Sequence, residues 1–452
     1  MRKRFPMLAL AASLLTSPAI GQEDQPSPAT RHAPPAGPIR GALFDTQYIR
    51  LARDSEGLLY TPKTIGPKAR IALVFAHPDN NVFSEAPGRE LASRGYRVFM
   101  VNYRGKGDTD EDDLPTISRG IQYLRTIPGV EKVLVVGHSG GGHLIPFYQN
   151  VAENGSAVCR RPGMVYQCSA KLDGLAKADG MVLLDPTFGA FHQASSVDPA
   201  VTPNGRDASL DMFAPANGYD LATRSGHYSA DFAKRFYAAQ AKRNDAIVAD
   251  ADARLAAIES GKGKFSDDEP MLIRGMGVLA AGARLYQADT TLQSHTKVPH
   301  LLLKADGTNV TTIIHSVRPP SGKEAVGHLD SLAVMNQNTT VRKFLAESAI
   351  RITPGYAMTD DDVKGVDWGS AMTSSPFNAE GITVPSLVLT MSCHYLVVPG
   401  EIIFNHLRAT DKTYASVEGA VHVFTPCGPQ YGDTVKRTFD FVDQWLSAKG
   451  RF

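Results

Sequence analysis

Residues 131–141 read EKVLVVGHSGG, and this stretch decides the fold. Its apolar start predicts a buried strand, and the residues after it, GHLIPFYQNVAE, predict a helix. Between them, Gly137-His138-Ser139-Gly140-Gly141 fits G-x-S-x-G. A serine between a strand and a helix, with glycines that let the two approach closely, is typical of a strained turn that exposes a nucleophilic hydroxyl. Ser139 is therefore the predicted nucleophile; the alternative is a glycine-rich turn with an inert serine.

Strands and helices alternate on both sides of this turn. Short helices are predicted at 87–94 and 114–125. The predicted buried strands are IALVFAH (71–77), RVFMVNY (97–103), EKVLVVG (131–137) and GMVLL (180–184), after two earlier strands, QYIRLAR and GLLYT. Apolar strands separated by helices predict a parallel sheet that is covered on both faces.

The alternation stops at residue 190 and resumes near residue 383. The intervening segment contains the most helical window of the chain, 229–260. Sheet pattern returns at 385–390 and 412–417, and an amphipathic helix follows at 434–446. We therefore expect one core in two parts, 42–189 and 383–452, with a large, helix-rich cap or lid inserted at 190–382.

The chain resembles the α/β-hydrolase superfamily through five motifs in the expected order. They are IALVFAHP, NYRGKG, VVGHSGGG, LLDP and EGAVHVF. The resemblance implies an α/β-hydrolase fold, with a mostly parallel, eight-strand sheet flanked by helices and a site at the carboxyl edge. It also implies an esterase-like or lipase-like serine hydrolase.

A serine hydroxyl needs a base to take its proton and an acid to orient that base. By resemblance, the base is His422, in the loop after the strand at 412–417; His394 and His406 are weaker candidates. No aspartate follows the strand at 385–390, where the superfamily most often places the acid. Asp185, at the end of 180–184, is the predicted acid because some lipases and dehalogenases use that position. Glu401 is the alternative acid.

The oxyanion formed in acyl transfer needs backbone N–H donors. Gly140, directly after the nucleophile, supplies one of them by resemblance. In Ala76-His77-Pro78-Asp79-Asn80, a proline replaces the usual glycine of the His-Gly motif. Because proline has no N–H, the second donor is predicted to be Asp79 or Asn80.

These residues predict hydrolysis of a carboxylic ester, small or polymeric, through an acyl-enzyme intermediate. The sequence carries no metal-binding or cofactor motif, so we expect neither. Lactonase, amidase or peptidase, and acyltransferase activities stay open because the same triad serves them all. A catalytically silent binding protein on a hydrolase fold is the alternative of another class.

The first 41 residues predict export. Basic MRKRF, an apolar run at 7–17 and small residues at 19–21 are typical of a signal peptide spanning 1–21. A membrane anchor would need about 20 apolar residues, roughly twice this run. Residues 22–41 are polar and proline-rich and predict a flexible leader. We expect a secreted or periplasmic protein.

Cysteines and charge agree with that expectation. Cys159 with Cys168 and Cys393 with Cys427 form plausible disulfide pairs for an oxidising compartment. Four cysteines allow three pairings, and four buried thiols are the alternative. With 47 basic and 46 acidic residues, the chain has no net field to attract nucleic acid. The sequence predicts no membrane span and does not indicate an oligomeric state.

Overall fold

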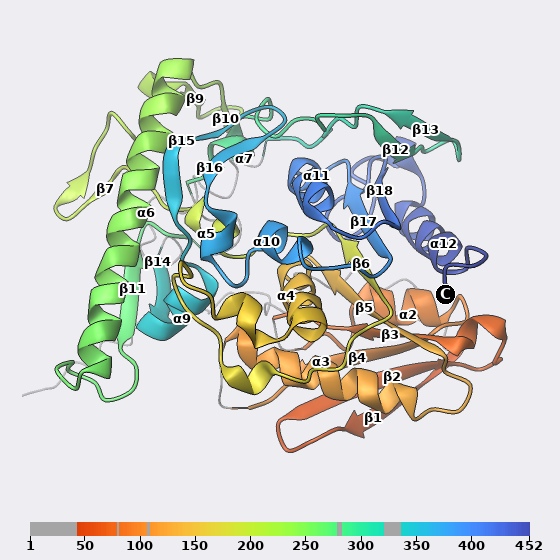
Figure 1. The fold of residues 1–452 in the computed structure, drawn as a ribbon. Coiled ribbons are helices and arrows are strands. Elements are labelled where there is room, and N and C mark those ends of the chain that lie inside the picture. The colour runs from red at the N-terminus through yellow and green to blue at the C-terminus, as the bar shows by residue number, and fades with distance from the viewer. Residues whose placement is uncertain (1–42, 79–80, 106–108, 278–282, 321–335) are drawn as a thin grey trace, which may run out of the picture.

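The computed structural model describes residues 43–452 apart from 79–80, 106–108, 278–282 and 321–335 (Figure 1). The predicted signal peptide and leader, residues 1–21 and 22–41, lie outside the described residues. Within the described part of the chain, no helix is both long and apolar enough to cross a membrane.

One large, mostly parallel sheet organises the molecule. In the described residues it has ten strands, in the order β1-β2-β4-β3-β5-β6-β17-β18-β12-β13. In that order the strands are Phe44–Arg50, Ser55–Pro62, Arg97–Tyr103, Ile71–Phe75, Lys132–His138, Gly180–Leu184, Ser386–Met391, Lys412–Val417, His300–Leu303 and Asn309–Thr312. Every pairing from β4 to β12 is parallel, whereas β1–β2, β2–β4 and β12–β13 are antiparallel. The predicted α/β-hydrolase fold is confirmed.

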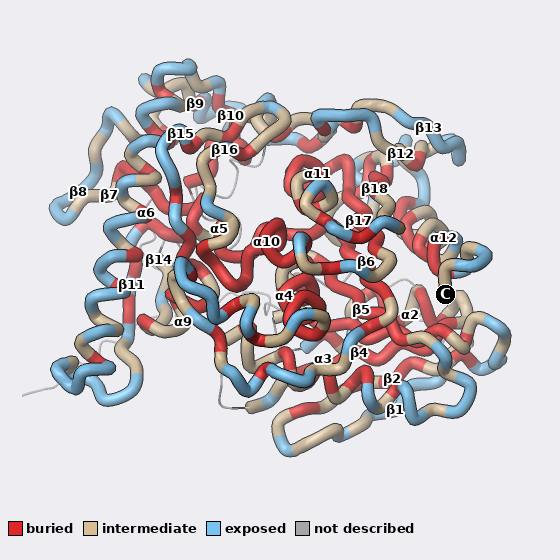
Figure 2. Tube along the Cα trace, viewed as in Figure 1, coloured by how far each residue is buried: buried red, intermediate tan, exposed pale blue. Residues whose placement is uncertain are grey.

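Helices cover both faces of this sheet because its strands are apolar on both sides. In β3, Ala72 and Val74 join one hydrophobic cluster, and Leu73 and Phe75 join another on the opposite face. The first face is covered by α3 (Asp110–Arg125), α4 (Gly141–Asn154) and α11 (Val397–His406), and the second by α2 (Ala86–Ala92) and α12 (Thr434–Leu446). Figure 2 shows the buried central strands between them.

The predicted insertion, 190–382, is not wholly separate from the sheet. Two of its strands, β12 and β13, extend the sheet, and β12 pairs in parallel with β18 at Leu301 and Ala415. The sheet therefore has two strands more than the predicted eight. Each of these strands has only four residues, and Asn309, Val310 and Thr311 of β13 are exposed. Strands of four residues are too short to show a pattern that separates them from a loop, and β13 is also polar.

The insertion is also less purely helical than predicted. Its longest helix is α6 (Ala230–Glu259), which begins at Ser229, whose hydroxyl accepts a hydrogen bond from the Phe232 N–H. The described residues of the insertion also form four two-stranded antiparallel sheets. These are β7–β8 (Val201–Thr202, Gly205–Arg206), β9–β10 (Tyr219–Asp220, Ser225–Gly226), β11–β14 (Pro270–Arg274, Asn336–Thr340) and β15–β16 (Ile352–Met358, Val363–Val366). Short strands, some with partners 62–70 residues away, escape a local pattern search.

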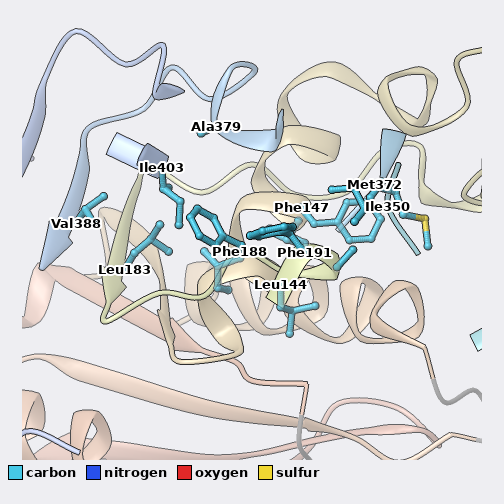
Figure 3. Packing of buried hydrophobic residues seen from close by; sticks show 14 of the residues in the cluster. Leu144, Phe147, Leu183, Phe188, Phe191, Ile350, Met372, Ala379, Val388 and Ile403 are labelled. Atoms are coloured by element: carbon cyan, nitrogen blue, oxygen red, sulfur yellow. The ribbon is translucent and has the colours of Figure 1, made fainter. Parts of the chain in front are cut away.

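The insertion shares a hydrophobic cluster with the core. Figure 3 shows Leu144 and Phe147 of α4 and Leu183 of β6 beside Phe188 and Phe191. The same cluster includes Phe232 and Phe236 of α6, Ile350 and Met372. The insertion is thus packed onto the face of the sheet that α4 covers, next to the turn that carries Ser139.

Candidate active site

Ser139 occupies a sharp turn between β5 and α4. Its φ of 55° lies in the left-handed region, which residues with a side chain rarely adopt. A Cβ at Gly137 would lie 2.1 Å from the Gly141 carbonyl oxygen, so only glycine allows the strand and helix to approach this closely. The Ser139 N–H donates to the Leu184 carbonyl at 3.1 Å, which ties the turn to the end of β6.

His422 reaches this serine from the loop after β18. Its Nε2 atom lies 2.7 Å from the Ser139 Oγ. Its backbone carbonyl accepts a hydrogen bond from His138 Nε2 at 2.8 Å, and the two rings lie 4.7 Å apart. The residue beside the nucleophile therefore helps to hold the loop that carries the imidazole.

Asp185 lies on the other side of the His422 ring. Its Oδ2 atom lies 2.6 Å from His422 Nδ1, and its Oδ1 accepts a hydrogen bond from the Met391 N–H at 3.1 Å. The side chain is fully buried. Burial alone raises the pKa of this carboxyl, but the imidazoles of His394 and His422 outweigh burial and hold the pKa well below its usual range. Asp185 therefore stays ionised beside His422.

The alternative acid, Glu401, is placed elsewhere, on α11. Its buried carboxylate accepts hydrogen bonds from the Lys297 N–H at 2.7 Å and the Val298 N–H at 3.1 Å. His300 Nε2 lies 2.8 Å from the same group. These contacts join α11 to the chain before β12 and do not lead to His422.

Gly140 stands at the start of α4, and its N–H points to a side chain. It donates to His77 Nε2 at 3.2 Å. Asp79 and Asn80, the predicted sources of a second oxyanion donor, lie outside the described residues.

The sequence is also similar to a known protein family. The model of the alpha/beta hydrolase family matches residues 73–309. The chain belongs to the α/β hydrolase family. No curated protein matches it significantly.

Several solved structures are similar to this family member at low identity. Est1E from Butyrivibrio proteoclasticus is 10% identical, covers 89% of this chain and 97% of its own, and has a TM-score of 0.37. A soluble variant of monoglyceride lipase from Saccharomyces cerevisiae is 12% identical, with coverages of 92% and 98% and a TM-score of 0.42. Carboxyl esterase 2 from the fungus Tuber melanosporum is 12% identical, with coverages of 90% and 86% and a TM-score of 0.37.

A second histidine, His394, also contacts Asp185. Its Nδ1 atom lies 2.7 Å from the same Oδ2, and its ring lies 4.5 Å from the ring of His422. Our sequence analysis considered His394 only as a weaker candidate for the base. Its place after β17, where an acid was expected, was the signal that pointed to this part of the site.

A third histidine, His143, lies behind the turn, and sequence reasoning missed it. His143 Nε2 lies 2.8 Å from the Asp110 carboxylate, and its Nδ1 lies 3.1 Å from the Thr187 hydroxyl. Thr187 in turn donates to the Ser139 carbonyl at 3.2 Å from its hydroxyl and at 3.1 Å from its backbone N–H. This network supports the nucleophile turn from the helix side.

The structure joins the four cysteines in the predicted pairs. Cys159 and Cys168 are bonded within one loop, and Cys393 is bonded to Cys427. The second bond connects the loop of His394 to the loop of His422. It therefore fixes the two imidazoles relative to one another.

Asp185, His394 and His422 are also the group that could best hold a metal ion, since their ligand atoms all lie within 4.8 Å of one another. Two ligands of a tetrahedral zinc ion, each about 2.0–2.1 Å from the metal, lie about 3.3 Å apart. Here the Asp185 oxygen lies 2.6 Å and 2.7 Å from the two nitrogens. These are hydrogen-bond distances, so the site fits N–H donors better than a metal.

Proposed function

We propose that this protein is a serine hydrolase that cleaves carboxylic esters, with Ser139 as nucleophile, His422 as general base and Asp185 as the orienting acid. The observation that carries the proposal is the continuous line of contacts from Ser139 Oγ to His422 Nε2 at 2.7 Å and from His422 Nδ1 to Asp185 Oδ2 at 2.6 Å. The positive φ of Ser139 supports it because strain of this kind is concentrated at functional sites.

Catalysis proceeds in two halves. In the first, Ser139 Oγ attacks the acyl carbon while its proton passes to His422 Nε2, and the C–O bond to the alcohol breaks as His422 returns that proton to the leaving oxygen. In the second, a water attacks the acyl-enzyme and gives its proton to His422. The Ser139 Oγ then leaves as the hydroxyl, and the carboxylic acid departs.

The negative oxygen of each tetrahedral intermediate is held by backbone donors. Gly140 N–H is the first, and its position at the N-terminus of the 14-residue helix α4 adds the favourable end of the helix dipole. Its contact with His77 ends when the acyl oxygen binds. Asp79 or Asn80 is the proposed second donor.

Asp185 rather than Glu401 is the proposed acid. Glu401 already accepts from two backbone N–H groups and pairs with His300. Asp185 is buried, ionised and adjacent to the nitrogen of His422 that faces away from Ser139. An acid in this position selects the tautomer in which Nε2 is free to take the serine proton.

We also propose that the protein is exported and works in the periplasm or the medium. The two disulfides support this proposal because such bonds persist in oxidising compartments. Sequencing of the mature amino terminus tests it. A start after Gly21 is the expected result, and an intact Met1 would overturn it.

A fluorophosphonate probe tests the proposed chemistry directly. We expect it to label wild-type protein at Ser139, and we expect Ser139→Ala to lose both labelling and hydrolysis of p-nitrophenyl esters. Ser196, which is fully buried and donates to the Gly277 carbonyl, offers a matched control as Ser196→Ala. Unchanged turnover in Ser139→Ala would refute the proposal, and absence of labelling in wild type would favour a silent binding protein.

A further inference from the structure

We propose that His394 is a positioning residue that shares the Asp185 carboxylate with His422 and extends activity toward acidic pH. This inference rests on the proposed function of Ser139, His422 and Asp185. It adds a second imidazole to that site, which then comprises one carboxylate and two histidines.

The contact between His394 and Asp185 requires a proton. The two atoms, Nδ1 and Oδ2, lie 2.7 Å apart, and Nδ1 is buried with no other partner among the described residues. The N–H is not aligned for a hydrogen bond, but a hydrogen on Nδ1 places positive charge next to the carboxylate oxygen, whereas a lone pair there places negative charge next to it. We therefore infer that Nδ1 of His394 carries a hydrogen.

The position of the His394 ring is set by several independent contacts. The ring lies 4.2 Å from the ring of Tyr395 and 4.5 Å from that of His422. The backbone N–H of His394 donates to the Met391 carbonyl at 3.1 Å, and its backbone carbonyl accepts from the Ser316 hydroxyl at 2.8 Å. The neighbouring Cys393 is bonded to Cys427, five residues after His422.

Burial keeps the ring of His394 neutral among several charged and titratable groups. They are Asp185 at the end of β6, His422 from the loop after β18, Arg318 from the segment after β13, the neighbouring Tyr395, and His192 from α5 (Ala190–Ala194), whose ring stacks 6.2 Å from that of Tyr395. Burial is the main influence on the pKa of His394 and lowers it, and His422 and Arg318 act in the same direction, while Asp185 opposes them. A neutral ring donates its N–H without adding a positive charge next to His422.

His394 also affects the pKa of Asp185. Among the groups that lower the pKa of Asp185, His394 has the largest influence, ahead of His422, first through its charge when it is protonated and then through its N–H. A carboxylate that is stabilised in this way attracts a proton on His422 less strongly. We therefore expect the wild-type enzyme to keep its base available at a lower pH than a variant without His394.

Steady-state hydrolysis of p-nitrophenyl acetate across pH tests this inference. We expect His394→Phe to lower kcat at mildly acidic pH by about tenfold and to move the acid limb of the kcat/KM profile upward by about one pH unit, with little change in KM. His394→Asn keeps an N–H at the position of Nδ1, so we expect it to restore most of the wild-type profile. His406→Asn is the matched control because His406, half exposed on α11, pairs only with the exposed Glu380.

An acid limb that stays in place in a folded His394→Phe protein would overturn the inference. If that variant does not fold, as judged by its Tm, His394→Leu provides the same comparison. Tautomers read by NMR on ¹⁵N-histidine-labelled wild type give a second result: a hydrogen on Nδ1 of His394 supports the inference, and one on Nε2 alone contradicts it. The NMR result does not depend on activity, so failure of fluorophosphonate labelling would count against the proposed function and not against this contact.

Discussion

Asp185 and Glu401 are two buried carboxylates that each hold a histidine, and of the two only Asp185 belongs to the line of contacts that reaches Ser139. Asp185 lies 2.6 Å from His422, and Glu401 lies 2.8 Å from His300. Both acids also accept hydrogen bonds from backbone N–H groups, one from Met391 in the first case and two in the second. By burial and hydrogen bonding alone, the two pairs are nearly alike.

The difference lies at the far side of each imidazole. The second nitrogen of His422 reaches Ser139 Oγ, which the strained turn holds in place. The ring of His300 packs instead against Tyr414 and Phe404, at centroid distances of 4.4 Å and 5.6 Å. A buried histidine–carboxylate pair thus serves equally well as a structural clamp. The contact with Ser139, the proposed nucleophile in a strained turn, distinguishes the pair at Asp185 from the pair at Glu401.

Neutralising each acid in turn tests directly which of the two supports turnover. We expect Asp185→Asn to lower kcat by about 10⁴-fold because the amide favours the wrong tautomer of the histidine. Glu401→Gln should leave kcat per folded molecule within about threefold, since Glu401 does not touch His422. Turnover of p-nitrophenyl esters, normalised to folded protein, measures both; a reversed order would make Glu401 the acid.

One of the two disulfides joins the loops whose histidines contact Asp185, and the other lies in a separate loop. Replacing Cys393 and Cys427 by serine should lower the free energy of unfolding by about 3 kcal/mol and reduce kcat, because the loops of His394 and His422 are no longer joined. The double variant of Cys159 and Cys168 is the control, with reduced stability and unchanged kcat. Urea unfolding and kcat measured on both variants test this, and equal loss of kcat in the two would contradict it.

Glu401→Gln should act on stability instead of chemistry. An amide in this position places an NH₂ group beside backbone N–H donors, and we expect a loss of about 1–3 kcal/mol in the free energy of unfolding. The loss should appear as a lower urea midpoint with an unchanged m-value. A midpoint equal to that of wild type would show that the clamp between α11 and the chain before β12 contributes little.

The smallest expected effect concerns pH and the buried His138. Burial holds the pKa of His138 well below its ordinary value, so the unfolded chain binds a proton here before the folded protein does. Its contribution to stability is therefore complete well above about pH 6.5 and is lost as the pH falls below that value. Between about pH 7 and pH 6 we expect wild type to lose about 0.7 kcal/mol more than His138→Gln. Urea midpoints at the two pH values test this, and parallel losses would contradict it.

The pKa of Asp185 acts in a lower window. Because it is depressed, the stability it contributes is present above about pH 4 and is lost as the pH falls further. The two windows do not overlap, so the difference between wild type and His138→Gln from about pH 7 to pH 6 does not include the contribution of Asp185.

The sequence by itself determined the elements around the nucleophile. The apolar run, the glycines and the following helix of residues 131–154 predict β5, the turn and α4, because each depends on sterics and periodicity within a few residues. The order of strands and helices up to β6 was likewise predictable. The predicted pairing of the cysteines also agrees with the structure.

Only the tertiary structure decided which side chains meet. Asp185 and His422 are 237 residues apart. No pattern of neighbouring residues predicts the contact of His394 with Asp185. The same is true of the contact of Glu401 with His300. The sequence did not predict that β12 and β13 extend the large sheet, because short strands are specified by distant partners. Local patterns depend on neighbouring residues, whereas a site is assembled from the ends of strands that packing brings to one edge of the sheet.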